Sequence, residues 1–250
     1  MVKFPWRNLI GKDRSEEVFM FNGKKKAVTF SFDDGVTQDV KAIEILNKYG
    51  LKATFNLNSS LLGLPGTLER NGCKVSHDKN TAADVRAIYG GHEVASHTLT
   101  HPNLVGLGDK TVIWQVETDR KVLSDLCGEE VVGMAYPCGG VNNDERVAEI
   151  IRKNTGVKYC RTVSSSFGFS KQENLYRFNP TVYYIDTDKM FELAEKFLSD
   201  ETPEGGLFYI WGHTYEMDAG YISWERFEEF CKMISGKKDV FYGTNKEVLL

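Results

Sequence analysis

The alternation of short apolar segments with helical segments is the feature that most constrains the fold of this 250-residue chain. Apolar runs predict strands at residues 27–32, 52–57, 93–97, 131–136, 157–162, 206–211 and 240–244. Helical periodicity predicts helices at residues 37–50, 81–89, 109–126, 143–153, 187–198 and 224–234. Strands that alternate with helices pair in parallel through crossover connections. We therefore predict an α/β fold, an irregular (β/α) barrel of about seven parallel strands, with an open doubly wound sheet as the alternative.

The chain is predicted to form a single barrel domain over residues 1–250, with residues 1–25 as an N-terminal extension. It contains no long linker and no internal repeat, and its hydrophobic content of 41% is sufficient for a core. Thr37 is expected to cap the first helix, with Val40 on its apolar face. Residues 63–80 are rich in turn formers and are predicted to form a long loop.

The overall charge and the cysteine pattern exclude several classes of protein. A net charge of −4 gives no reason to expect a nucleic-acid partner. The five cysteines contain no CxxC pair, which argues against a disulfide framework and for a reducing compartment. The chain shows neither the apolar run of a signal peptide nor a membrane-spanning stretch. We therefore predict a cytoplasmic protein without a membrane partner, and the oligomeric state stays open.

Residues that can carry chemistry follow the predicted strands. In a β/α barrel the active site lies at the carboxyl ends of the strands, so these residues are expected to meet at one end. They are Asp33 and Asp34, His97 and His101, the Tyr136–Pro137–Cys138 segment, and His213. His77 and His92 are assigned structural roles, although His77 could face substrate from the long loop.

Two adjacent carboxylates, Asp33 and Asp34, repel each other unless a positive charge lies beside them. His97 and His101 stand at i and i+4, which on a helical turn would direct both imidazoles to one face. One aspartate and two histidines make a three-ligand set with positions left open for water and substrate. The positive partner is thus predicted to be a divalent metal, although two surface or capping histidines would show the same spacing.

The second aspartate of the pair then has a chemical role available to it. A bound metal lowers the pKa of its water, and a neighbouring carboxylate can take the proton as general base. The alternative for this aspartate is a loop or helix cap.

The blocks "TFSFDDG", "ASHTLTHP", "AYPCGG" and "IWGH", with "LKATFNLN" as a second strand, resemble the successive motifs of the polysaccharide deacetylases, carbohydrate esterase family 4 with the NodB-homology fold. The resemblance covers roughly residues 26–215 and implies an irregular β/α barrel of about seven strands. It implies that Asp34, His97 and His101 are the metal ligands. It further implies that Asp33 is the general base and that His213 is the general acid that protonates the leaving nitrogen.

The chain departs from the family pattern at the arginine that often pairs with the general base. Ala135 stands at that position, so the partner of the base must come from elsewhere. Arg161, which lies at the end of the strand predicted at 157–162, is our candidate, and an ordinary surface arginine is the alternative.

Two further departures concern the walls of the site. Cys138 replaces the usual tyrosine after the proline, and its backbone N–H is implied to stabilise the oxyanion. Trp211 replaces a leucine, and its ring would narrow the acyl pocket or form a wall for a sugar face, unless it only fills the core. Tyr136 and Pro137, in the same block as Cys138, are predicted to contact substrate.

The predicted function is that of a metal-dependent hydrolase that removes an N-linked acetyl group from an amino sugar or a sugar polymer. The cofactor is expected to be zinc, with cobalt, nickel or manganese also compatible with the ligand set. One alternative is a barrel that binds metal and sugar without turnover, and another is a deacylase of a small, non-polymeric amide. A lyase or isomerase would need a lysine or another carboxylate at a further strand end, and none is recognisable in the sequence.

Overall fold

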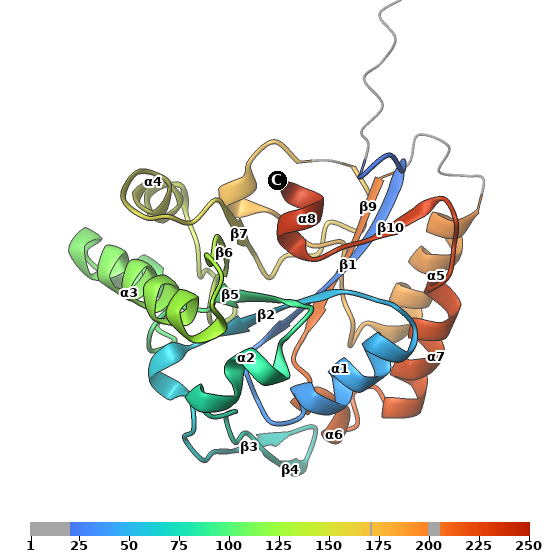
Figure 1. Ribbon diagram of the computed structural model, residues 1–250, viewed down its shortest axis with the longest axis horizontal. Helices are drawn as coiled ribbons and strands as arrows, with labels where there is room; N and C mark the ends of the chain where they lie inside the picture. The colour runs from blue at the N-terminus through green and yellow to red at the C-terminus, as the bar shows by residue number, and fades with distance from the viewer. Residues whose placement is uncertain (1–20, 171, 200–205) are drawn as a thin grey trace, which may run out of the picture.

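A curled sheet of parallel strands forms the centre of the molecule in this computed structural model, which describes residues 21–170, 172–199 and 206–250 (Figure 1). Seven strands follow one another in the order β7-β6-β5-β2-β1-β9-β8, and β10 pairs with the first residues of β1. The strands are β1 (Lys26–Asp33), β2 (Ala53–Leu57), β5 (Glu93–Ser96), β6 (Gly133–Ala135), β7 (Tyr159–Arg161), β8 (Val182–Tyr183), β9 (Gly206–Gly212) and β10 (Val240–Tyr242).

The two edges of this sheet are joined by the chain that leads into β8. Arg161 at the end of β7 forms a parallel bridge with Phe178, and β8 then pairs with β9 on the opposite edge. The sheet is therefore an incompletely closed barrel. The predicted α/β fold with an irregular parallel barrel is confirmed.

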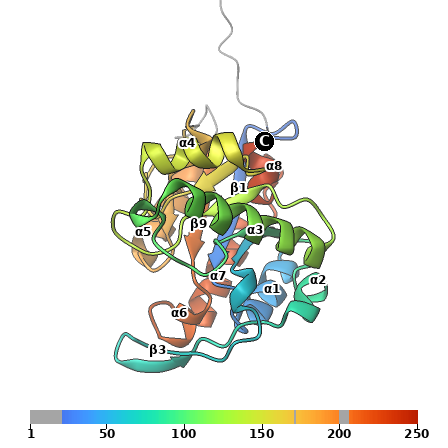
Figure 2. The ribbon, with the colours of Figure 1, turned by 90° about the vertical axis from the view of Figure 1, so that its left-hand side faces the viewer.

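Helices surround the sheet (Figures 1 and 2). They are α1 (Asp39–Lys48), α2 (Val85–Ile88), α3 (Asp109–Cys127), α4 (Glu145–Asn154), α5 (Thr187–Leu198), α6 (Tyr215–Asp218), α7 (Trp224–Ile234) and α8 (Asn245–Leu249). The periodic helices α3, α5 and α7 begin and end close to their predicted positions. Short 3₁₀ turns lie at Ser59–Leu61, Ala82–Asp84, Leu104–Gly106 and Leu175–Arg177.

The first helix begins later than predicted. Its N-cap is Gln38, and the N–H of the preceding Thr37 is hydrogen-bonded to the carbonyl of Asp78. Ile43 and Leu46 of the helix are buried, as their spacing predicts, but Val40 is 40% exposed and Ala42 is buried instead.

The segment 63–80 is not the long loop that was predicted. It contains the antiparallel hairpin of β3 (Thr67–Arg70) and β4 (Cys73–Ser76). Asn71 and Gly72 form its turn, and both have positive φ angles, 51° and 70°. An Asn-Gly pair between two strands is the preferred sequence for such a turn, so the signal for the hairpin was present. The hairpin lies beside α6 in both views (Figures 1 and 2).

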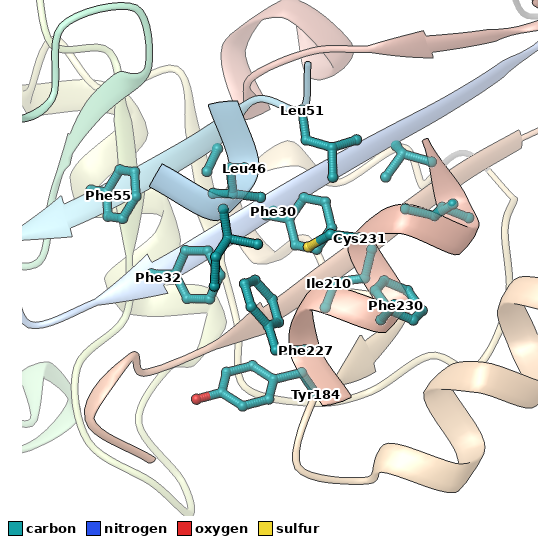
Figure 3. Close-up of a cluster of buried hydrophobic side chains, with 14 of the residues drawn as sticks. Phe30, Phe32, Leu46, Leu51, Phe55, Tyr184, Ile210, Phe227, Phe230 and Cys231 are labelled. Carbon is teal, nitrogen blue, oxygen red and sulfur yellow. The ribbon is translucent and has the colours of Figure 1, made fainter. Parts of the chain in front are cut away.

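The side chains of β1 alternate between two buried environments. Phe30 and Phe32 point to the layer of α1 and α7 (Figure 3). There Phe30 packs edge-to-face with Phe227 and with Phe230, with 6.2 Å between ring centroids in each pair. Residues two apart on a strand share a face, so Ser31 and Asp33 share the opposite face of β1. β1 thus directs one carboxylate towards the polar side of the sheet.

Buried polar side chains on that face form a connected network. Asn56 on β2 donates to the Ser31 hydroxyl and to the Asp33 carboxylate, both at 2.9 Å. Asn245, the first residue of α8, accepts from the Thr29 hydroxyl at 2.9 Å and donates its backbone N–H to the Thr54 hydroxyl at 2.8 Å. The helix α8 therefore anchors the strands near their amino ends, away from Asp33.

The single domain with an N-terminal extension stays a prediction, and residues 1–20 of that extension lie outside the described residues. In the part of the chain that the structure describes, no helix has both the length and the apolar character needed to cross a membrane.

Phe30→Ala is expected to lower the free energy of unfolding by about 3–5 kcal/mol, because it leaves a cavity among rings that are fully buried. Urea denaturation of this variant and of Val40→Ala, whose side chain is exposed, measures the difference. A loss for Phe30→Ala no larger than the loss for Val40→Ala would contradict the position of the core.

Candidate active site

The chemistry-bearing residues meet at the carboxyl ends of the strands, around a cavity of about 660 Å³. Asp33 ends β1, and Asp34 follows it. The cavity is lined by Asp33, Asp34, His97, His101, Tyr136, Cys138, Trp211 and His213 among others. Pro137 is buried, and it is not one of the described residues that line the cavity.

Asp34, His97 and His101 come together as a possible metal-binding group. One potential ligand atom from each lies within 4.8 Å of the other two. The Oδ1 atom of Asp34 is 3.9 Å from Nε2 of His97 and 3.5 Å from Nε2 of His101. One carboxylate oxygen and two imidazole nitrogens fit zinc and several other divalent ions, so the residues present suit such a cofactor.

The imidazole of His97 is held in the form that a metal needs. Its Nδ1 lies 2.9 Å from the carbonyl oxygen of Ala135, which leaves Nε2 directed towards the cavity. Burial lowers the pKa of His97 to about 4, and this outweighs the opposing effect of Asp33. The side chain is therefore neutral at physiological pH, as ligation requires.

The turn that carries the two histidines is not helical, so that prediction is wrong. Thr98 and His101 have positive φ angles, 67° and 60°, which a right-handed helical turn does not contain. Asn58 holds this turn by donating to the carbonyl of Thr98 at 2.8 Å. Asp34 and Cys138 also have positive φ angles, 83° and 69°. A positive φ angle at a non-glycine residue costs about 1–3 kcal/mol of free energy per residue. Such residues cluster at functional sites, where surrounding contacts maintain the conformation.

Asp33 lies beside this group, and it has its own cationic partner. The guanidinium of Arg161 donates to both carboxylate oxygens of Asp33, and Arg161 is fully buried. Burial alone would raise the pKa of Asp33, but Arg161, His97 and His213 outweigh it and lower the pKa below its usual value. Asp33 is therefore an ionised carboxylate in a site where it is only 2% exposed.

The position of Arg161 follows from strand register. In the parallel pair of β6 and β7, Arg161 is the partner of Ala135, where the family pattern often has arginine. The guanidinium thus reaches Asp33 from β7, the strand next to the one that carries the family's usual arginine position. Its central carbon also lies 4.4 Å from the ring centroid of Trp211, a cation–π contact.

Trp211 forms one wall of the cavity. Its ring stacks on Tyr183 with 4.1 Å between ring centroids and an interplanar angle of 17°. Tyr136, by contrast, is fully buried, and its hydroxyl donates to the carbonyl of Tyr176 at 2.8 Å. Trp211 is itself only 4% exposed and is contacted by both Tyr183 and Arg161, so the geometry fits the core-filling alternative, and the half-buried Tyr183 offers more surface to a substrate.

Cys138 borders the site through its side chain and its backbone. Its Sγ lies 3.9 Å from Nδ1 of His101, and Asn142 donates to the carbonyl of Cys138 at 2.7 Å. Burial and the nearby charge of Asp34 raise the pKa of the thiol. This environment does not favour a nucleophilic thiolate.

His213 stands opposite the histidine pair and carries a positive charge. Its Nε2 is 3.9 Å from the Asp33 carboxylate, and its Nδ1 is 3.2 Å from the carboxylate of Glu216. Burial alone would lower the pKa of His213, but Glu216, Asp34 and Asp33 outweigh it and raise the pKa to about 9. The imidazolium can therefore donate a proton at neutral pH.

Glu216, a buried residue of α6, was assigned no specific role from the sequence. Glu216 accepts the backbone N–H of His213 at 3.0 Å and the hydroxyl proton of Tyr183. Its spacing of three residues from His213 was the available signal, because a one-turn helix after the strand returns that side chain to the imidazole.

Two residues after β4 also belong to the site: Lys79, which was not anticipated, and His77, for which contact with substrate was the alternative to a structural role. Lys79 donates from Nζ to the carbonyl oxygen of Asp34 at 2.8 Å. Nε2 of His77, which was assigned a structural role, lies 3.0 Å from Oδ2 of Asp34. Without the hairpin, no sequence pattern connects these residues with the end of β1.

Comparison with known proteins agrees with the resemblance found in the sequence. A family model described as "Polysaccharide deacetylase" matches residues 21–159, which is more than half of the chain. A curated relative, the peptidoglycan-N-acetylglucosamine deacetylase PgdA of Listeria monocytogenes, is 30% identical over 129 residues. That match covers 50% of this chain and 24% of the relative, so the chain spans about a quarter of the relative's length.

Two solved structures share the fold. The Xyl-CE4 domain of a xylanase from the hindgut metagenome of Trinervitermes trinervoides has a TM-score of 0.54 and 16% identity, with 89% of each chain covered. A CE4 family pseudoenzyme from Bacillus anthracis has a TM-score of 0.53 and 17% identity, over 90% of this chain and 66% of the other. The match to the family model, together with this shared fold, establishes that the chain belongs to the polysaccharide deacetylase family.

Proposed function

We propose that this chain is a metal-dependent hydrolase that removes the N-acetyl group of an amino sugar in a carbohydrate polymer. One observation carries the proposal: an ionised Asp33, paired with Arg161, lies between a three-ligand metal set and a protonated His213. Family membership supports action on carbohydrate. The named activity of the Listeria relative, deacetylation of N-acetylglucosamine in peptidoglycan, supports the choice of an N-acetylated amino sugar.

Asp34, His97 and His101 would hold the divalent ion, which we propose to be zinc, with cobalt, nickel or manganese as alternatives. When bound, such an ion supplies Lewis acidity towards the acyl group and lowers the pKa of water. The N,N,O donor set is the observation that fits this cofactor.

The chain's own residues then divide the proton transfers. Asp33 takes the proton of the attacking water as general base, and Arg161 holds its carboxylate ionised and oriented. His213 donates its proton to the nitrogen as the C–N bond breaks, and Glu216 keeps it charged and in place. The backbone N–H of Cys138 donates to the acyl oxygen as that atom gains negative charge.

The substrate would enter a cavity with an aromatic wall and a polar floor. Trp211 and Tyr183 both line the cavity, and Tyr183 keeps part of its surface exposed, so a sugar ring can lie against Tyr183. A cytoplasmic location stays a prediction of the sequence.

Binding without turnover is the alternative that one finding favours, because a structural neighbour is a pseudoenzyme. The complete set of Asp33, Arg161 and His213 argues against it. A lyase or isomerase is less well supported, even though Lys79 supplies the lysine that was not recognised in the sequence. The ammonium of Lys79 is engaged by the carbonyl of Asp34.

Asp33→Asn and Asp34→Asn make a matched pair, because the two residues are adjacent and differ in their proposed roles. Asp33→Asn is expected to retain metal and to lose about 10²–10⁴-fold in kcat for acetate release, because the base is gone. Asp34→Asn is expected to weaken metal binding, since a ligand charge is removed.

Metal content and acetate release from N-acetylated chito-oligosaccharides, each with and without a chelator, measure both effects. Asp239→Asn, an exposed aspartate, is the control. A wild-type rate for Asp33→Asn would remove Asp33 as the base, and full metal occupancy in Asp34→Asn would overturn the ligand assignment.

The pH profile tests the role of His213. Its pKa is raised from 6.5 to about 9, so its contribution to stability is present below about pH 6.5 and is lost as pH rises through 9. The protonated acid disappears over the same range, so kcat/KM should fall as pH approaches 9. Glu216→Gln removes the carboxylate that raises this pKa and should move the alkaline limb to lower pH.

The measurement is kcat/KM against pH for wild type, Glu216→Gln and the exposed control Glu225→Gln. An alkaline limb that stays in place in Glu216→Gln would show that His213 is not the acid that Glu216 supports.

A further inference from the structure

Lys79 is a buried lysine in the wall of the active-site cavity, with only 8% of its surface exposed. It follows the β3–β4 hairpin and forms an antiparallel bridge with Val36, just beyond the two aspartates. Its Nζ lies 2.8 Å from the carbonyl oxygen of Asp34, 3.9 Å from Oδ1 of the same residue and 3.3 Å from Nε2 of His77. A buried ammonium group is costly without such partners, so its position requires an explanation.

Lys79 and Arg161 contact adjacent aspartates in different ways: Arg161 donates to both carboxylate oxygens of Asp33, whereas Lys79 donates to the backbone carbonyl of Asp34 and lies 3.9 Å from its carboxylate. Arg161 comes from β7 and pairs with the Asp33 carboxylate, whereas Lys79 comes from the hairpin and lies beside Asp34. Each of the two adjacent carboxylates therefore has a basic residue of its own, supplied by a different part of the chain. The charges of Arg161 and Lys79 thus offset those of Asp33 and Asp34, and the charge of His213 is offset by Glu216.

Lys79 also supports the backbone conformation of Asp34. Asp34 has a φ angle of 83°, an unfavourable backbone conformation for a non-glycine residue. The carbonyl that accepts from Lys79 belongs to this residue, so the ammonium helps to fix the backbone from which the carboxylate projects. Oδ2 of Asp34 is contacted by His77, which leaves Oδ1 directed at His97 and His101.

We propose that Lys79 is the fixed counter-cation of Asp34, and that it stabilises the metal-free protein while weakening the affinity for metal. This rests on the metal site of the proposed function. Lys79 attracts the Asp34 carboxylate when no ion is bound, and it repels a divalent ion placed against Oδ1.

The inference predicts two effects of opposite sign from one substitution. Lys79→Met keeps the length of the side chain and removes its charge. The metal-free variant should unfold at a lower temperature than wild type. Its Kd for Zn²⁺ should be lower by about tenfold or more, because it binds the ion more tightly. A lysine that only fills space would lower stability without tightening the binding of metal.

The hairpin provides a matched control in Lys74, an exposed lysine of β4. Lys74→Met makes the same chemical change on the same hairpin and should leave both quantities as in wild type. Lys79→Arg keeps the positive charge and should leave the Kd for Zn²⁺ close to that of wild type.

The experiment measures thermal unfolding with chelator, and Kd by competition for Zn²⁺ with a chromophoric chelator, for wild type and the three variants. Neither measurement depends on deacetylation. A Kd for Lys79→Met equal to or higher than that of wild type would overturn the proposal. A Kd lowered as much in Lys79→Arg as in Lys79→Met would also overturn it. If wild type itself bound no Zn²⁺, the proposed function would fail first, so the two failures are distinguishable.

A Lys79→Met variant that folds only in the presence of Zn²⁺ would support the proposal, because the ion would then replace the missing charge. If it folded in neither condition, Lys79→Gln would take its place, since glutamine removes the charge and keeps a donor for the Asp34 carbonyl. A Kd for Lys79→Gln no tighter than wild type would then overturn the proposal.

Discussion

The burial of two adjacent carboxylates at the end of β1 is the constraint on which the rest of the site depends. Asp33 and Asp34 are 2% and 7% exposed, and neither could remain ionised in such a place without compensation. The chain separates them by geometry. Asp33 shares the polar face of β1 with Ser31, whereas the positive φ angle of Asp34 turns the next carboxylate towards the rim. Two neighbouring residues thereby acquire different partners and can have different roles.

The surroundings of Asp33 keep it in one orientation. Arg161 contacts both of its oxygens, and Asn56 links it to Ser31 on the same strand. Nearer the amino end of β1, the Thr29 hydroxyl donates a hydrogen bond to Asn245 of α8, which extends the same polar layer. A general base is most effective when its supporting shell is rigid, and this network of strands and a terminal helix supplies that rigidity.

The sequence predicted the barrel and the end of the barrel at which the site lies, because both depend on local periodicity. Arg161 could be named as a candidate partner of Asp33 because it ends a predicted strand, and the register of β6 and β7 brings it there. The helical turn at His97 and His101 was wrong, because a spacing of four does not specify the positive φ angles that the loop adopts. Tyr136 was placed in the right motif, but its side chain packs inwards.

Lys79 and Glu216 were not predicted as parts of the site, although the sequence held a signal for each: the Asn71–Gly72 turn for the hairpin that carries Lys79, and a spacing of three residues from His213 for Glu216. Lys79 and His77 reach Asp34 only through the β3–β4 hairpin, whose Asn71–Gly72 turn was not recognised. Glu216 reaches His213 through α6, a single turn too short to show periodicity. These three residues surround the groups that the motifs did identify, and they set the charge of those groups.

We expect the Asp34 carboxylate, beside Lys79, to bind a divalent ion, and the Asp33 carboxylate, beside Arg161, to stay free of it. Anomalous diffraction at the zinc edge, from crystals grown with Zn²⁺, tests this directly. An ion is expected at about 2.0–2.2 Å from one oxygen of Asp34 and from Nε2 of both His97 and His101, with Asp33 still paired to Arg161. An ion coordinated by Asp33 in place of Asp34, or no anomalous signal between these side chains, would contradict it.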